Sequence, residues 1–173
     1  GDTATIANRQ LKLADIVLAL GESRAIKQAL DTVEQSLALL REQEDIPSII
    51  DALSMLADLY RAEGNLPQAQ SLYLEALQLY GEFGEERKIG RCLLGLVQIC
   101  LDQGKVERAV YLYGALEARQ KASTPMHPAQ RTAYDQVAFQ TRAQLPEAEF
   151  DQALSKGSTA TLATLLANSV EEN

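Results

Sequence analysis

Few residues of this chain have the types and spacing that catalysis or metal binding requires. His127 is the one histidine of the sequence, and it stands between Pro125 and Pro128 in a segment without an obvious nucleophile motif. A serine–histidine–aspartate arrangement would have to include this residue, and a metal site needs three or four organised ligands. We therefore expect His127 to be a solvent-exposed or capping residue.

The two cysteines are no better placed for chemistry. Cys92 and Cys100 stand eight positions apart on one predicted helix, which separates their Cα atoms by about 12 Å. A disulfide needs less than about 7 Å between Cα atoms, so the two residues cannot pair with each other. We predict two small, buried thiols in a reduced, cytoplasmic setting.

Phosphate-binding and acid–base motifs are missing as well. Gly104–Lys105 lacks the G-x-x-x-x-G-K-[ST] pattern with which backbone amides hold phosphate, and we interpret it as a turn between helices. The pair Glu85–Glu86 is interpreted as a solvated helix start and not as paired catalytic carboxylates. No catalytic, cofactor-binding or metal-binding residue is predicted, and we expect a protein that is not an enzyme and needs no cofactor.

Composition sets further bounds on function. The chain has 173 residues, of which 46% are hydrophobic, and a formal net charge of −8. A nucleic-acid-binding protein needs a concentrated cationic face, so direct binding of DNA or RNA is not expected. No apolar run approaches the roughly 18–20 residues of a membrane-spanning helix, and no membrane association is expected. The chain begins with Gly1, and we expect it to be a fragment of a longer protein.

The elements that would position any site are helices, because apolar residues recur at helical spacing and no stretch alternates with period two. Asp45 or Ser48 is expected to cap one helix, and Gly64 to end it. In the first segment the stripe expected to face the core is Leu13, Ile16, Val17 and Leu20. We predict helices at 4–20, 24–42, 48–63, 66–80, 85–103, 105–121 and 128–144, a short one after Pro146, and a last one at 160–170.

Two segments of the chain repeat each other forty positions apart. The first has Leu53, Leu56, Gly64, Ala69, Leu72 and Tyr73, and the second has Leu93, Leu96, Gly104, Ala109, Leu112 and Tyr113. Each copy is predicted to be a helix, a glycine turn and a second helix. A single helical hairpin cannot bury its apolar stripe alone, so stacked hairpins share a core and form a solenoid.

The first copy resembles a tetratricopeptide repeat. The residues that occupy the family's positions are Leu56, Ala57, Tyr60, Gly64, Ala69, Tyr73 and Ala76. The second copy departs from the pattern at Val97 and Cys100. A third, degenerate copy fits residues 5–41, with Leu13 and Ile16 at core positions and Arg24 in place of the glycine.

This resemblance implies an all-α fold, a tetratricopeptide-like superhelix or helical-hairpin solenoid. Three hairpins are expected over residues 1–122, up to a break at 123–128. Residues 123–173 are expected to form C-terminal helices that continue or cap the solenoid.

A narrower pattern runs through residues 91–170. Its members are Arg108, Ala109, Leu112, Gly114, Ala115, Glu117, Arg131, Tyr134, Arg142, Leu145 and Phe150. Together they resemble the C-terminal repeat region of large bacterial signal-transduction ATPases, including LuxR-type transcriptional regulators. Those proteins join an ATPase core to tetratricopeptide-like repeats and to an output domain. The ATPase core and the output domain are not in this chain. The resemblance implies a regulatory role in transcription or signal transduction.

In tetratricopeptide proteins the first helix of each hairpin lines a concave groove. The residues opposite the core stripe, and hence the candidate partner-binding residues, are Asp51, Ser54, Asp58, Arg61, Arg91, Leu94, Gln98 and Leu101. Leu94 and Leu101 are expected to form a small exposed apolar patch, which usually marks a contact. The alternative is that the helix at 128–144 folds back and covers them.

These observations predict a protein-protein interaction module whose partner is another protein or a domain of its own parent protein. A protein or small inducer in the groove would change how the repeats pack on the ATPase core. The alternative function is self-association as a homodimer, because the end hairpins of a solenoid expose apolar surface and the first repeat is weak. An enzyme is the third interpretation, and turnover by the chain alone would favour it.

Overall fold

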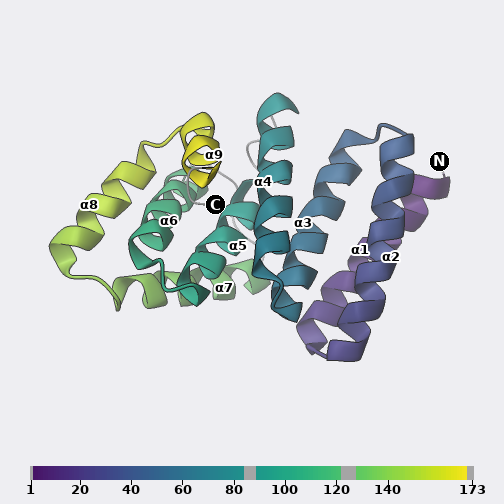
Figure 1. Cartoon of the computed structure of the whole chain (residues 1–173), viewed down its shortest axis with the longest axis horizontal. Helices are drawn as coiled ribbons and strands as arrows, with labels where there is room; N and C mark the ends of the chain where they lie inside the picture. Colours follow the sequence, from purple (N-terminus) through teal and green to yellow (C-terminus); the bar gives the residue numbers. More distant parts are fainter. Residues whose placement is uncertain (1, 84–88, 122–127, 171–173) are drawn as a thin grey trace. The chain divides into compact units, whose positions relative to one another are not determined.

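The computed structural model describes residues 2–83, 89–121 and 128–170, and every regular element in these ranges is a helix (Figure 1). Most helices pack against a neighbour in the sequence. The predicted all-α class, built of helical hairpins, is confirmed. The predicted positions Glu85, Glu86 and His127 lie outside the described residues.

The chain forms two compact units, residues 1–83 and 84–173. The helices of unit 1 are α1 (Asp2–Leu20), α2 (Ser23–Glu42), α3 (Ile46–Glu63) and α4 (Leu66–Phe83). Those of unit 2 are α5 (Ile89–Asp102), α6 (Val106–Lys121), α7 (Pro128–Arg142), α8 (Glu147–Ser158) and α9 (Leu162–Val170). The neighbours in the sequence that pack together are α1 with α2, α2 with α3, α3 with α4, α5 with α6 and α6 with α7. The boundary expected after residue 122 lies inside unit 2, because α6 packs against both α7 and α8.

The two copies of the forty-residue repeat have matching local structure. Gly64 ends α3 with φ 88°, and Gly104 follows α5 with φ 71°, both in the left-handed region that favours glycine. At the start of α3, the Asp45 carboxylate accepts hydrogen bonds from the Ser48 backbone N–H at 3.3 Å and from the Ser48 hydroxyl at 2.8 Å. Asp45 is therefore the N-cap, as one of the two sequence-based options predicted.

The apolar positions of the repeat lie in the core of each unit. Leu53, Tyr73 and their neighbours are buried in unit 1, and the corresponding residues around Leu93 and Tyr113 are buried in unit 2. Cys92 and Cys100 are buried on α5, as predicted. Residues forty positions apart thus occupy equivalent places in two successive hairpins.

The apolar stripe predicted for α1 is wrong. Leu13, Ile16 and Leu20 are exposed, and the buried residues of this helix are Ala7, Leu11 and Ala14. The turn after α1 is also displaced from the position that the repeat pattern predicted. Because α1 is followed by a left-handed glycine at position 21 and not at 24, the first hairpin stands 43 residues before the second, and not 40.

With the turn glycines Gly21 and Gly64 aligned, the buried residues Ala7, Leu11 and Ala14 of α1 correspond to Ile50, Ser54 and Ala57 of α3, which are buried too. In the same register the exposed residues Leu13 and Ile16 correspond to Leu56 and Leu59, which are buried on α3. The two helices differ because α3 packs against α1, α2 and α4, whereas α1 packs against α2 and α3.

In unit 2 the backbones of α6 and α8 come into direct contact through two glycines. A Cβ atom at Gly114 would overlap the carbonyl oxygen of Leu154, and one at Gly157 would overlap the carbonyl oxygen of Tyr111. Beside this crossing, Val110, Phe150 and Ala153 form a buried apolar cluster. The missing side chains let the helices approach closely enough to bury that cluster.

Arg119 of α6 stabilises the turn that follows α8. Its guanidinium donates one hydrogen bond to the Ala160 carbonyl at 3.1 Å and another to the Ala115 carbonyl of its own helix at 3.0 Å. A charged donor makes a stronger hydrogen bond than a neutral one, so this side chain connects α6 to the segment between α8 and α9.

Candidate functional site

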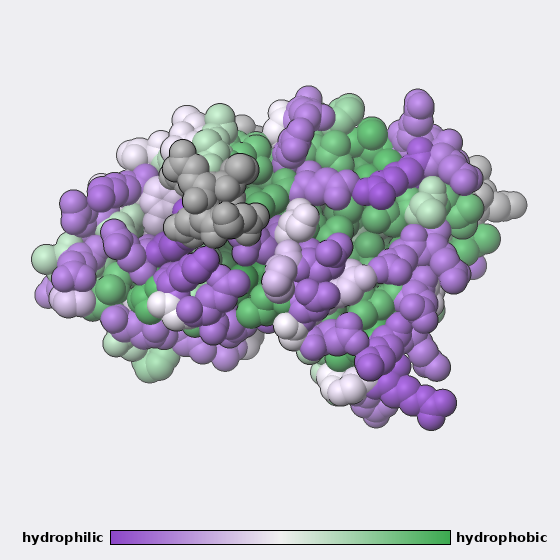
Figure 2. Space-filling model, in the orientation of Figure 1, coloured by the Kyte–Doolittle hydropathy of each residue, from purple (hydrophilic) through white to green (hydrophobic). Residues whose placement is uncertain are grey.

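The candidate residues on α3 differ in their exposure. Asp51 is exposed, and Asp58 and Arg61 are half-buried. Ser54 is 1% exposed, and its hydroxyl donates a hydrogen bond to the Ile50 carbonyl at 3.0 Å. Ser54 therefore belongs to the interior of unit 1 and does not present its side chain to a ligand. Figure 2 shows apolar residues on the surface around α3, between α2 and α4, bordered by hydrophilic ones.

Asp58 and Arg61 are coupled to a buried tyrosine of the neighbouring helix. The hydroxyl of Tyr73, on α4, donates a hydrogen bond to the Asp58 carboxylate. Burial of Tyr73 and the adjacent Asp58 charge raise the pKa of this phenol well above its usual value, and the Arg61 charge opposes that rise. The Nε atom of Arg61 is buried without a hydrogen-bond partner. These two candidate residues thus help to join α3 to α4.

Other charged and polar side chains connect the helices of unit 1. The Tyr60 hydroxyl donates to the Glu34 carboxylate, and this hydrogen bond raises the pKa of Tyr60 to about 12. Arg41 of α2 pairs with Glu75 of α4 at 2.6 Å. Sequence reasoning assigned Tyr60 to the repeat core, but its hydroxyl reaches the half-exposed edge between α2 and α3. The exposed part of α3 is therefore narrower than the helical projection predicted.

The candidate residues on α5 share an intermediate exposure. Arg91, Leu94, Gln98 and Leu101 are all half-buried. α7 packs against α5, the helix that carries these residues. Leu94 and Leu101 thus form a partly covered apolar edge and not an open patch. The candidate residues of α3 and of α5 belong to different units, and each set is a separate candidate surface.

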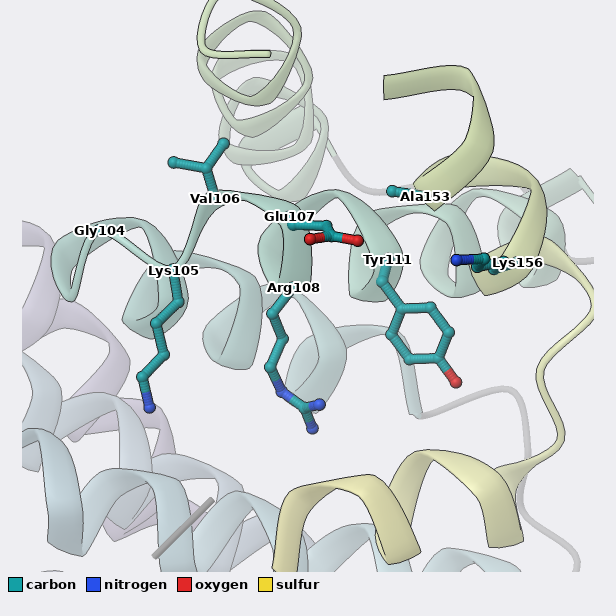
Figure 3. Close-up of a pocket in the computed structure, with 8 residues that line it drawn as sticks. All are labelled: Gly104, Lys105, Val106, Glu107, Arg108, Tyr111, Ala153 and Lys156. Atoms are coloured by element: carbon teal, nitrogen blue, oxygen red, sulfur yellow. The ribbon is translucent and has the colours of Figure 1, made fainter. Parts of the chain in front are cut away.

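Unit 2 also contains a hollow of about 690 Å³ beside the start of α6 (Figure 3). Lys105, Arg108 and Tyr111 project to one side of α6, and Lys156 extends from α8. The Tyr111 hydroxyl is buried without a hydrogen-bond partner. The lining thus combines three cationic side chains with the carboxylate of Glu107. Sequence reasoning missed this hollow, because Lys156 joins the others only through the packing of α8 on α6.

Three residues of the narrower resemblance, Tyr134, Arg142 and Phe150, take part in aromatic contacts between helices. The rings of Tyr113 and Tyr134 lie 5.5 Å apart between centroids, which joins α6 to α7. The Arg142 guanidinium lies 5.4 Å from the centre of the Phe150 ring, which joins α7 to α8. Burial raises the pKa of the Tyr113 phenol, and burial also raises that of Tyr134. These positions hold the C-terminal helices of unit 2 together.

The described residues lack the arrangements that a metal site or a membrane-spanning helix would need. In these ranges no group of three or more histidine, cysteine or acidic side chains is arranged to hold a metal ion. Within the same part of the chain, no helix is both long enough and apolar enough to cross a membrane.

Comparison with protein families gives one match. Residues 48–122, which contain α3 to α6, match the family described as tetratricopeptide repeat. Comparison with curated proteins and with solved structures gave no match. The matched segment includes both copies of the forty-residue repeat, and the fold is tetratricopeptide-like. Repeats of this family generally mediate protein-protein interaction.

Proposed function

We propose that this chain is the protein-binding, regulatory module of a larger cytoplasmic bacterial protein, a transcriptional regulator or a signalling ATPase. The match of residues 48–122 to the tetratricopeptide repeat family carries the protein-binding part. The regulatory part is based on the resemblance of residues 91–170 to signal-transduction ATPases. The partner is another protein or a second domain of the same parent polypeptide.

The surfaces proposed for this contact are the exposed part of α3 and the partly covered edge of α5. Asp51 is the exposed candidate on α3, and Leu94 with Leu101 gives α5 an apolar edge. The acidic group of unit 1 suits a partner segment with basic residues, and the apolar edge of unit 2 suits a segment with apolar residues. In the proposed mechanism, a bound protein or small inducer changes how these helices pack on the ATPase core.

The test uses the other domains encoded with this chain, produced separately and titrated by calorimetry. Asp51→Lys and Leu94→Glu should each weaken binding at least about tenfold, as expected for reversal of a charge or burial of a new one in a contact. Asp31→Lys is the matched control, because it makes the same charge change at an exposed residue of α2. Unaltered binding by both variants, or a coding sequence without further domains, would contradict the proposal.

A further inference from the structure

Helix α1 has apolar residues on two opposite faces. Ala7, Leu11 and Ala14 are buried against the rest of unit 1, where α1 contacts α2 and α3 (Figure 1). The opposite face has four large apolar residues that remain exposed: Ile6 (52%), Leu13 (61%), Ile16 (57%) and Leu20 (68%). A surface helix of a globular protein normally has one apolar stripe and one polar face. The second stripe needs a partner outside unit 1.

The spacing of this second stripe is that of a coiled-coil seam. Ile6, Leu13 and Leu20 are seven residues apart, and Ile16 follows Leu13 by three. Residues at a and d of a heptad have this spacing, and they pack against a parallel or antiparallel helix. In the described part of the chain, the other large exposed apolar residues are Leu39, Phe83 and Phe139, on three separate helices. Among the described residues, the large exposed apolar side chains therefore gather on one face of α1.

We propose that α1 pairs with α1 of a second copy of this chain, antiparallel, across a two-fold axis near Leu13. Three of its four residues are symmetrical about Leu13, since Ile6 and Leu20 each lie seven residues from it, and Ile16 falls opposite Gln10 of the second copy. A two-fold axis at this point places Ile6 against Leu20 of the second copy, and Leu13 against its own equivalent. This inference goes beyond the binding of a different protein, and it gives a surface to the self-association alternative.

Charge favours an antiparallel pair of α1 helices over a parallel pair, and it favours contact through α1 over contact through a more acidic face. Arg9 occupies the remaining d position, and a parallel pair would place it against Arg9 of the second copy. In the antiparallel pair it lies near Val17, where its aliphatic stem can pack while the guanidinium stays in water. Asp2, Arg9, Lys12 and Asp15 give α1 no net charge. Two chains of charge −8 therefore repel each other less at α1 than at a more acidic face.

The size of the contact predicts a weak dimer. A helix of 19 residues is about 28 Å long, and a strip about 10 Å wide along it buries roughly 300 Å² per chain. Stable interfaces bury about 1,200–2,000 Å² in total, so a dissociation constant of order 100 µM is expected. The association then depends on concentration, and a tether within a larger protein would strengthen it.

Sedimentation equilibrium between about 10 and 500 µM tests the pairing, over a range chosen to span such a constant. The average mass should rise from 18.9 kDa towards twice that value. Leu13→Glu places two carboxylates together on the axis and should raise the dissociation constant at least tenfold. Phe139→Glu, at an apolar residue of α7 that is more exposed than Leu13, should leave the dissociation constant unchanged, and circular dichroism verifies that both variants fold. A constant mass of 18.9 kDa, or equal association by Leu13→Glu, would overturn the pairing.

Cysteine cross-linking tests the orientation. A mixture of Ile6→Cys and Leu20→Cys chains should form the mixed disulfide dimer under mild oxidation, and Ile6→Cys alone should not. Cross-linking of Ile6→Cys with itself would overturn the antiparallel assignment. Self-association is measured on this chain alone and partner binding on the chain with the other domains added, so failure of the pairing and failure of the partner-binding proposal can be distinguished.

Discussion

The close approach of α8 to α6 at Gly157 makes Gly157→Ala an informative substitution for the fold. The new Cβ atom would overlap the Tyr111 carbonyl oxygen and lie 2.8 Å from the Tyr111 carbonyl carbon and 3.2 Å from the Ala115 nitrogen. Ordinary contacts of this kind need about 3.5 Å, so α8 must move away from α6 by roughly 1–2 Å. Backbone atoms cannot rotate out of the way as a flexible side chain does.

The expected loss of stability comes from the apolar cluster between α6 and α8 that this movement loosens. Val110, Phe150 and Ala153 pack at the same crossing, and a gap of about 0.5–1 Å forfeits a quarter to a half of each dispersion contact. Overpacking of this kind costs about 1–3 kcal/mol and sometimes more, while alanine gains up to about 1 kcal/mol over glycine in helix propensity. We expect Gly157→Ala to lower the free energy of unfolding by about 2 kcal/mol, the upper end of that cost less the gain in helix propensity.

Urea denaturation followed by far-ultraviolet circular dichroism measures this loss. Gly90→Ala is the control, because it makes the same change on α5, where the nearest atom is Leu116 Cδ1 at 3.7 Å, an ordinary contact. The control should stay within about 0.5 kcal/mol of the wild type or exceed it. Equal stability of the two variants would refute the close approach of α6 and α8. Faster hydrogen exchange confined to α8 in Gly157→Ala would support it.

Three further predictions concern unit 1. Tyr73→Phe should lower the free energy of unfolding by about 1.5–3 kcal/mol, because a buried hydrogen bond to the Asp58 carboxylate is lost. Urea titration measures this difference, and a change below about 0.5 kcal/mol would contradict the prediction. The pKa of Tyr60 is raised to about 12 by its hydrogen bond to Glu34, so the fold favours the neutral phenol. Stability should hold up to about pH 10, the ordinary phenol value, and fall as the pH rises towards 12, and Tyr60→Phe should make that fall shallower in alkaline urea titrations. Gly64→Ala should cost about 1–2 kcal/mol in thermal unfolding, because φ 88° is strained for any residue with a Cβ atom; an unchanged melting temperature would show that the turn adapts.

The candidate surfaces were predictable from the sequence only in part. Helical projection placed Asp51, Asp58 and Arg61 on one side of α3, but it could not show that Tyr73 of the next helix binds Asp58. Ser54 was assigned to the same side and is buried, because neighbouring helices cover a wider arc of α3 than one stripe. The hollow beside Lys105 could not be predicted from the sequence, because its lining combines residues about fifty positions apart.

By itself the sequence determined the helices, their turns and the kinship of the two central hairpins. Helical period and the left-handed preference of glycine act within a few residues, so the pattern around Gly64 and Gly104 is sufficient to predict them. The tertiary structure alone decided which face of α1 is buried and which is left with Leu13 exposed. It also decided that α8 lies on α6 through Gly157. Both depend on where a distant helix packs, and no local pattern carries that information.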